Sequence, residues 1–264
     1  MRRLSTSGIP YVDWGGEGIP LHFAHANGFP PGTYNTFIEQ LTDHFRVLGM
    51  ECRAMWAVKD PAEFRHWREM GEDLALFLSE MKLSGILATG HSLGAVTSLL
   101  CAAAHPSLIR ALILIDPVIV PAWVAPIWAL AMLLRLNRRF PLAVQARRRR
   151  VEWPQKDVIV RAYRSAHVFD RWQEPFLHDY VSSVVTDSPS GGVSLRYPRE
   201  WEARIFETAP PDVWLTFLRL RRFPLLVLRG EHSNTYTRGT LRLMRWLLPM
   251  GPLSRSREPI TLYL

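Results

Sequence analysis

The 264-residue chain has little cysteine. Its two cysteines, Cys52 and Cys101, form neither a CxxC pair nor any metal-ligand spacing. This excludes a disulfide scaffold and a cysteine-based zinc site. A reducing compartment suits such a chain, and we expect a cytoplasmic protein.

Lysine is also scarce. The only lysines are Lys59, Lys82 and Lys156, so arginine supplies 29 of the 32 basic residues. Such a bias is typical of a GC-rich genome. The net charge of +8 is therefore a weak indication of a nucleic-acid ligand, and we expect no nucleic-acid partner.

Long apolar runs are few. No apolar stretch follows the basic start at residues 1–6, so we expect no secretion signal. Residues 117–134 carry no charge, but three prolines interrupt them, and about 18 residues is the lower limit for crossing a bilayer. We expect an apolar lid segment here and no membrane partner.

What the chain does contain is typical of a soluble globular protein, with 48% hydrophobic and 21% charged residues. Strand-like and helix-like blocks alternate, which predicts an α/β fold with a mostly parallel sheet covered by helices. The predicted strands are 19–26, 45–50, 85–89, 111–115 and 224–228, and the predicted helices are 64–81 and 93–104.

About a hundred residues between the last two strands lack this rhythm. We interpret residues 118–208 as an inserted helical cap, and residues 1–117 and 209–264 as the core. After residue 248 the expected last strand and closing helix are doubtful.

The motif at Gly90–Gly94 reads Gly-His-Ser-Leu-Gly, a G-x-S-x-G between a predicted strand and a predicted helix. A serine at such a tight turn adopts a strained backbone that flanking glycines make possible, and its hydroxyl stands clear of the sheet. A glycine-rich turn can show the pattern alone, but this placement indicates that Ser92 is a nucleophile.

A second motif, His25-Ala26-Asn27-Gly28-Phe29-Pro30, follows the first core strand. Together the two motifs resemble those of the α/β-hydrolase family, in which a His-Gly-x-Pro loop supplies one oxyanion amide. Asn27 stands where the family often has histidine. The resemblance implies a capped serine hydrolase whose oxyanion donors are the backbone N–H groups of Phe29 and Leu93.

In this family the chain order of the triad is serine, acid, histidine. The usual acid position falls on Asn234, which cannot supply a negative charge. Two carboxylates can replace it: Asp116, at the end of the 111–115 strand, and Glu231. We favour Asp116, although it could merely cap a loop.

The base is missing from its expected place, because the chain has no histidine after His232. His232 itself falls in the acid loop. If residues 249–264 are encoded by GC-rich codons, a reading frame that begins at the third base of each codon can encode a strand and a histidine loop. The histidine of that loop would span the codons of Ile260 and Thr261. We therefore hypothesise that this tail is out of frame, which the nucleotide sequence tests.

The predicted cap is rich in aromatic residues, which could wall an apolar pocket or pack the cap on the core. Its run Arg147–Arg150 could contact an anion or form a solvated face. The resemblance implies no metal and no organic cofactor. We expect a serine hydrolase that forms an acyl-enzyme on Ser92 with a small or medium ester-like substrate. The alternative is a catalytically impaired protein with a binding role or none; the oligomeric state stays open.

Overall fold

The computed structural model describes residues 1–56, 60–165, 169, 172–189, 191–231, 233 and 235–247. His232, Asn234 and the tail from residue 249 lie outside these residues, and so do the predictions made for them.

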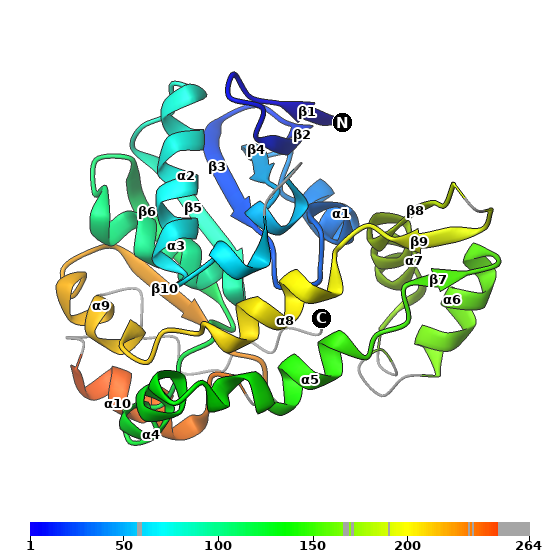
Figure 1. The fold of residues 1–264 in the computed structure, drawn as a ribbon. Helices are drawn as coiled ribbons and strands as arrows, with labels where there is room; N and C mark the ends of the chain where they lie inside the picture. Colours follow the sequence, from blue (N-terminus) through cyan, green and yellow to red (C-terminus); the bar gives the residue numbers. More distant parts are fainter. Residues whose placement is uncertain are drawn as a thin grey trace.

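A seven-stranded sheet forms the centre of the molecule (Figure 1). Its strands are β1 (Arg2–Leu4), β2 (Pro10–Gly15), β3 (Ile19–Ala24), β4 (Phe45–Met50), β5 (Ile86–His91), β6 (Ile109–Ile115) and β10 (Leu225–Leu228). The strand order is β1-β2-β4-β3-β5-β6-β10, and the strands from β4 to β10 in this order are parallel. The fold is therefore α/β with a mostly parallel sheet, as the sequence predicts.

Helices cover both faces of this sheet. The helices that accompany the sheet strands are η1 (Pro31–Tyr34), α1 (Asn35–Glu39), η2 (Arg53–Met55), η3 (Pro61–Glu63), α2 (Arg68–Glu80), α3 (Leu93–Ala104), α9 (Val213–Arg219) and α10 (Arg238–Leu247). Alternate residues of β4 reach opposite faces: Leu48 belongs to the core cluster under α2 and α3, whereas Val47 belongs to the cluster with Ile38 of α1. Burial on both faces explains why these strands are apolar throughout.

The predicted core elements are present with small shifts. Strand 45–50 and helix 93–104 have the predicted bounds. The helix predicted at 64–81 begins later, at Arg68, because Pro61 starts the separate turn η3. The N-terminal strands β1 and β2, which pair antiparallel, were not predicted.

Residues 118–208 contain more than helices. The helical elements are α4 (Ala125–Leu133), η4 (Leu136–Arg139), α5 (Pro141–Arg147), α6 (Lys156–Arg164), α7 (Glu174–Val184) and α8 (Arg199–Glu207), and the strands are β7 (Glu152–Trp153), β8 (Val185–Asp187) and β9 (Val193–Leu195). The three strands form a small antiparallel sheet. The segment is mostly helical, and the three short strands add to what the sequence predicts, because strands of two or three residues are too short to show an alternating pattern.

Two further features concern membrane-spanning helices and the cysteines. Among the described residues, no helix has the length and hydropathy needed to cross a bilayer. Both cysteines are buried and free.

Candidate active site

Ser92 lies at the turn between β5 and α3, at the carboxyl end of the sheet. Its backbone has φ 54° and ψ −112°, a region that non-glycine residues enter only when the surroundings enforce it. The turn is anchored because the Ser92 N–H donates to the Ile115 carbonyl of β6 at 2.9 Å. Ser92 is only partly buried. The strain and the exposure are those expected of a nucleophile elbow.

Gly90 and Gly94 allow the backbone of the Ser92 turn to lie against neighbouring backbone segments. A Cβ on Gly90 would lie 2.4 Å from the Gly94 carbonyl carbon, and a Cβ on Gly94 would lie 2.0 Å from the Ala24 carbonyl oxygen. Each contact is with backbone, which cannot swing away. The start of α3 is thus pressed against the end of β3, and this brings the Ser92 turn beside the loop that carries Phe29.

The two predicted oxyanion amides occupy these neighbouring segments. Leu93 is the first residue of α3, so its N–H has no carbonyl partner inside the helix. The Phe29 N–H donates to the Ala26 carbonyl at 3.1 Å in a tight turn, with Gly28 at φ +77°. An oxyanion bound by Phe29 would therefore share this N–H with the Ala26 carbonyl, or take the place of that carbonyl as its acceptor.

Asn27, the residue that departs from the family motif, is buried and tied to α8. Its side-chain amide donates to the Glu202 carbonyl at 3.0 Å and its oxygen accepts from the Tyr197 hydroxyl at 2.9 Å. Asn27 therefore fixes the loop that carries Phe29.

The aromatic residues of the predicted cap gather around Phe29. The Phe29 ring lies 5.0 Å from that of Tyr180 and 6.1 Å from that of Trp172, and Phe169 lies 4.8 Å from Tyr180. Phe169 and Tyr180 are buried. These side chains pack on one another, so they hold the Phe29 loop in place and do not wall an open pocket.

Two arginines of the run 147–150 form ion pairs. Arg147 forms ion pairs with Glu200 and Glu207, and Arg149 pairs with Glu202. Arg149 also donates to the Tyr180 hydroxyl at 2.9 Å. Arg147 and Arg149 therefore connect the helices near the Phe29 loop.

Asp116 follows β6, directly beside the Ser92 turn. Its Oδ1 accepts from the Gly230 N–H at 3.3 Å and its Oδ2 accepts from the Thr235 hydroxyl at 3.0 Å. The carboxylate thus belongs to the loop after β10, where the family's usual acid would lie. Glu231, next to Gly230, is exposed. Of the two candidate acids, Asp116 is the one fixed by hydrogen bonds at the carboxyl ends of the strands.

Within the described part of the chain, no histidine is hydrogen-bonded to Ser92 or Asp116. His22 and His25 each accept a backbone N–H from the β4 side of the sheet, at 3.1 Å from Met50 and 2.9 Å from Cys52. Burial lowers the pKa of His22 to about 3. Both histidines are packed core residues.

One contact beside Ser92 was not predicted. His91 Nδ1 lies 2.9 Å from the Tyr34 hydroxyl, which also accepts the Ala26 N–H at 3.2 Å. Burial lowers the pKa of His91 to about 4, with the Asp116 charge opposing. This neutral imidazole links the Ser92 turn to the loop after β3. Its place in the motif was visible in the sequence, but its partner, Tyr34, was not.

Neither cysteine competes with Ser92 as a nucleophile. Burial raises the pKa of the Cys52 and Cys101 thiols to about 12, so neither is a thiolate at neutral pH. Among the described residues, no group of three or more His, Cys, Asp or Glu side chains could hold a metal ion. The chemistry that these residues offer is attack by the Ser92 hydroxyl.

Comparison with known proteins agrees with this geometry. Residues 23–259 match the sequence model of the α/β hydrolase family. No curated protein matches the chain.

Several solved structures share the fold. An E-2-(acetamidomethylene)succinate hydrolase has 17% identity and a TM-score of 0.75, over 94% of this chain and 88% of that one. The thioesterase domain from the curacin biosynthetic pathway has 16% identity and a TM-score of 0.71, over the same shares. An enol-lactonase from Burkholderia xenovorans LB400 has 18% identity and a TM-score of 0.64, also over 94% and 88%.

Proposed function

The chain belongs to the α/β hydrolase family, and on that premise we propose that it hydrolyses an ester-like substrate through an acyl-enzyme on Ser92. The observation that carries this proposal is the backbone of Ser92, held at φ 54° between β5 and α3. Such strain is retained where it serves a function. Structures with this fold include a thioesterase and an enol-lactonase, both of which act on acyl groups.

The proposed steps follow from the side chains around the turn. The Ser92 hydroxyl attacks the acyl carbonyl, and the N–H groups of Leu93 and Phe29 stabilise the resulting oxyanion. The leaving group departs with a proton, and water then hydrolyses the acyl-enzyme. Asp116 is the proposed acid that orients the base. The substrate would be a small or medium acyl compound.

The histidine that would act as the base is supplied by the hypothesis that the tail is out of frame. In the shifted frame a histidine falls across the codons of Ile260 and Thr261, outside the described residues. A variant in which residues 249–264 are replaced by the shifted-frame sequence is expected to hydrolyse p-nitrophenyl esters about 10⁶-fold faster than the present chain. The same variant with Ser92→Ala is the control, and equal rates for all three proteins would contradict the proposal.

A second candidate function rests on one observation: no described histidine is hydrogen-bonded to Ser92. A chain without a base would bind acyl compounds and turn them over poorly, since loss of a triad member leaves only about 10³ to 10⁴-fold catalysis over water. Ester binding without turnover, unchanged by the tail replacement, would support this alternative.

Two further expectations also remain proposals. The first is the division into a core (1–117 and 209–264) and a cap (118–208). The second is the cytoplasmic location, which the buried, free thiols of Cys52 and Cys101 support.

A further inference from the structure

Helix α4 is an apolar helix that lies on the surface. None of its residues is buried, and it carries no charge from Ala125 to Leu133. Ile127 is 70% exposed, Leu130 54% and Leu133 78%. Soluble monomers rarely expose a contiguous apolar patch of this kind without an interaction that uses it.

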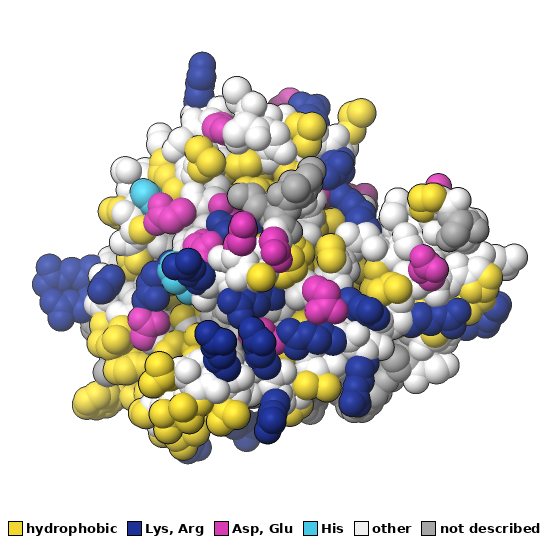
Figure 2. Space-filling view, viewed as in Figure 1, with side chains coloured by type: hydrophobic (Ala, Val, Ile, Leu, Met, Phe, Trp, Pro, Cys, Tyr) yellow, Lys and Arg dark blue, Asp and Glu magenta, His cyan; other side chains and the backbone are white. Residues whose placement is uncertain are grey.

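The helix is anchored to the body of the protein by Trp128, which leaves its other side exposed. The Trp128 indole donates to the Ala209 carbonyl at 2.7 Å and its ring stands edge-on to Phe140. Trp123 touches Gly239 of α10, and α10 places Trp246 on the surface, 81% exposed. Figure 2 shows hydrophobic side chains gathered at the lower left, where Figure 1 places α4 and α10.

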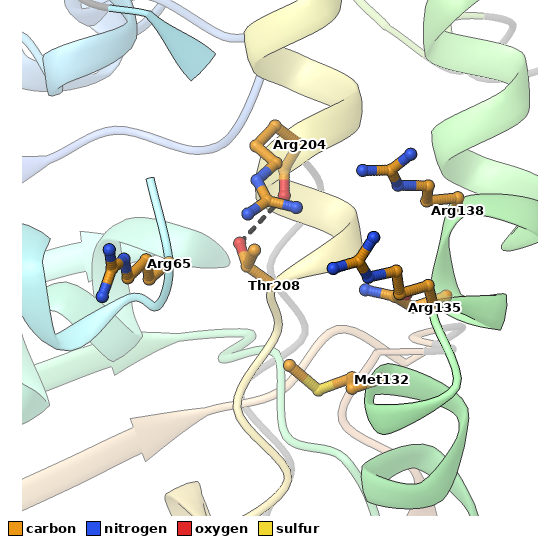
Figure 3. Close-up of a pocket in the computed structure, with 7 residues that line it drawn as sticks. Arg65, Met132, Arg135, Arg138, Arg204 and Thr208 are labelled. Atoms are coloured by element: carbon orange, nitrogen blue, oxygen red, sulfur yellow. Dashed lines mark hydrogen bonds between the residues drawn. The ribbon is translucent and has the colours of Figure 1, made fainter. Parts of the chain in front are cut away.

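An arginine-lined cleft adjoins this apolar surface. A cavity of about 320 Å³ lies between α4, η4 and α8, and Met132 of α4 forms part of its wall. Figure 3 shows Arg135 and Arg138 reaching toward α8, which carries Arg204, with Arg65 on the other side of that helix. A polar, cationic cleft thus continues directly from the apolar helix.

The positive charge of this cleft is largely unneutralised. Arg204 donates to the Phe64 carbonyl at 2.8 Å and lies 3.5 Å from Glu207, whose carboxylate also pairs with Arg147. In the described part of the chain, the side chains of Arg65, Arg135 and Arg138 form no ion pair.

The two segments that build the surface carry charge of one sign only. Residues 117–151 and 235–247 contain arginines and no aspartate or glutamate. In α10, Arg238, Arg242 and Arg245 are exposed. A second copy of this chain would bring arginine against arginine across such a face, which is unfavourable. An anionic bilayer meets both halves of the surface: its acyl boundary accepts the apolar side chains and its phosphates accept the arginines.

We propose that the surface formed by α4, α10 and the arginine cleft docks onto an anionic lipid bilayer. In this proposal Ile127, Leu130 and Leu133 enter the headgroup–acyl boundary of the bilayer. The exposed side chains of Trp123 and Trp246 lie at the interface between lipid and water. Arg135 and Arg138 bind lipid phosphates. From the sequence alone we expected an apolar lid segment and no membrane partner, because three prolines interrupt residues 117–134 and their length is the lower limit for crossing a bilayer. This proposal does not depend on the activity of Ser92.

The test is flotation of the full chain with phosphatidylcholine vesicles containing about 30 mol % phosphatidylglycerol. We expect binding to these vesicles, weaker binding at high salt, and weaker binding to pure phosphatidylcholine. Inorganic phosphate at the lipid phosphate concentration is expected not to compete. Competition by phosphate, or no binding to anionic vesicles, would overturn the proposal.

Two double variants separate the two halves of the surface. Arg135→Glu/Arg138→Glu is expected to lower the partition coefficient at least about 25-fold, since each arginine near an anionic surface accounts for about five-fold. Ile127→Ser/Leu133→Ser is expected to lower it about ten-fold or more. All four side chains are exposed, so the far-UV circular dichroism is expected to stay unchanged.

Matched controls come from surfaces away from α4. Leu4→Ser removes a side chain that is 63% exposed on β1, which Figure 1 places at the opposite end of the molecule. Arg110→Glu reverses an exposed arginine at the start of β6. Both are expected to bind like the parent chain. Equal losses in controls and test variants would refute this surface as the docking site. So would a concentration-dependent dimer that the Ile127→Ser/Leu133→Ser variant abolishes.

Discussion

Replacing Gly94 by alanine is expected to destabilise the protein strongly. The added Cβ would lie 2.0 Å from the Ala24 carbonyl oxygen, 2.3 Å from the Ala24 carbonyl carbon and 2.7 Å from the His25 carbonyl oxygen. Because all three contacts are with backbone, α3 or the end of β3 must move. Overpacking in a tight core costs typically about 1–3 kcal/mol, and contacts this short place Gly94→Ala at the upper end.

The assay is thermal unfolding followed by circular dichroism at a fixed scan rate. For a domain of this size, about 3 kcal/mol corresponds to a drop in Tm of about 6–12 °C. Gly230→Ala is the matched control: it lies in the loop beside Asp116, and the nearest atom to its new Cβ is 3.9 Å away. A Tm of Gly94→Ala within the error of the parent and of Gly230→Ala would refute the close approach of α3 to β3.

Three more predictions concern buried charge and the site. Arg149→Met leaves Glu202 buried without its partner, so it should lower the free energy of unfolding by about 3–5 kcal/mol, and Arg149→Met/Glu202→Leu should recover most of this in urea titrations. Burial lowers the pKa of His91 to about 4 from 6.5, so the unfolded chain takes up a proton first as the pH falls. The His91 contribution to stability is therefore lost between pH 6.5 and 4, and His91→Gln should flatten the decline of the urea midpoint there; an unchanged slope would contradict this. In the variant that carries the shifted-frame tail, Asp116→Asn should reduce Ser92-dependent ester hydrolysis by about 10⁴-fold, whereas Glu231→Gln should not, and the reverse result would reassign the acid.

The core of the fold could be predicted from the sequence because its elements are strongly apolar. Strand 45–50 and helix 93–104 are buried on most sides, so their composition alone marks them. The strands β1, β7, β8 and β9 contain only two or three residues, which is too short to show an alternating pattern.

The site could be predicted only in part, for a related reason. Ser92 and its glycines lie within five residues, so the sequence contains the whole turn. Tyr34, by contrast, reaches His91 from 57 positions away, and the hydrogen bonds that Asp116 accepts come from the loop after β10. Contacts over such separations arise from the fold and have no local signal.

The exposed position of α4 could not be predicted from the sequence either. An apolar stretch such as residues 117–134 suggests burial, because apolar residues usually form the core. Only the packing of Trp128 and Trp123 shows which side of the helix faces the protein and which faces outward. That difference turned an expected lid into a candidate docking surface.

The most direct test of the central claim is reaction with a fluorophosphonate probe followed by peptide mass spectrometry. Such probes phosphonylate an activated serine hydroxyl, and the modified peptide identifies the residue. In the variant that carries the shifted-frame tail, the account predicts a single label on the peptide that contains Ser92, and loss of labelling when Ser92→Ala is added. An unlabelled variant, or a label that persists after Ser92→Ala, would contradict it.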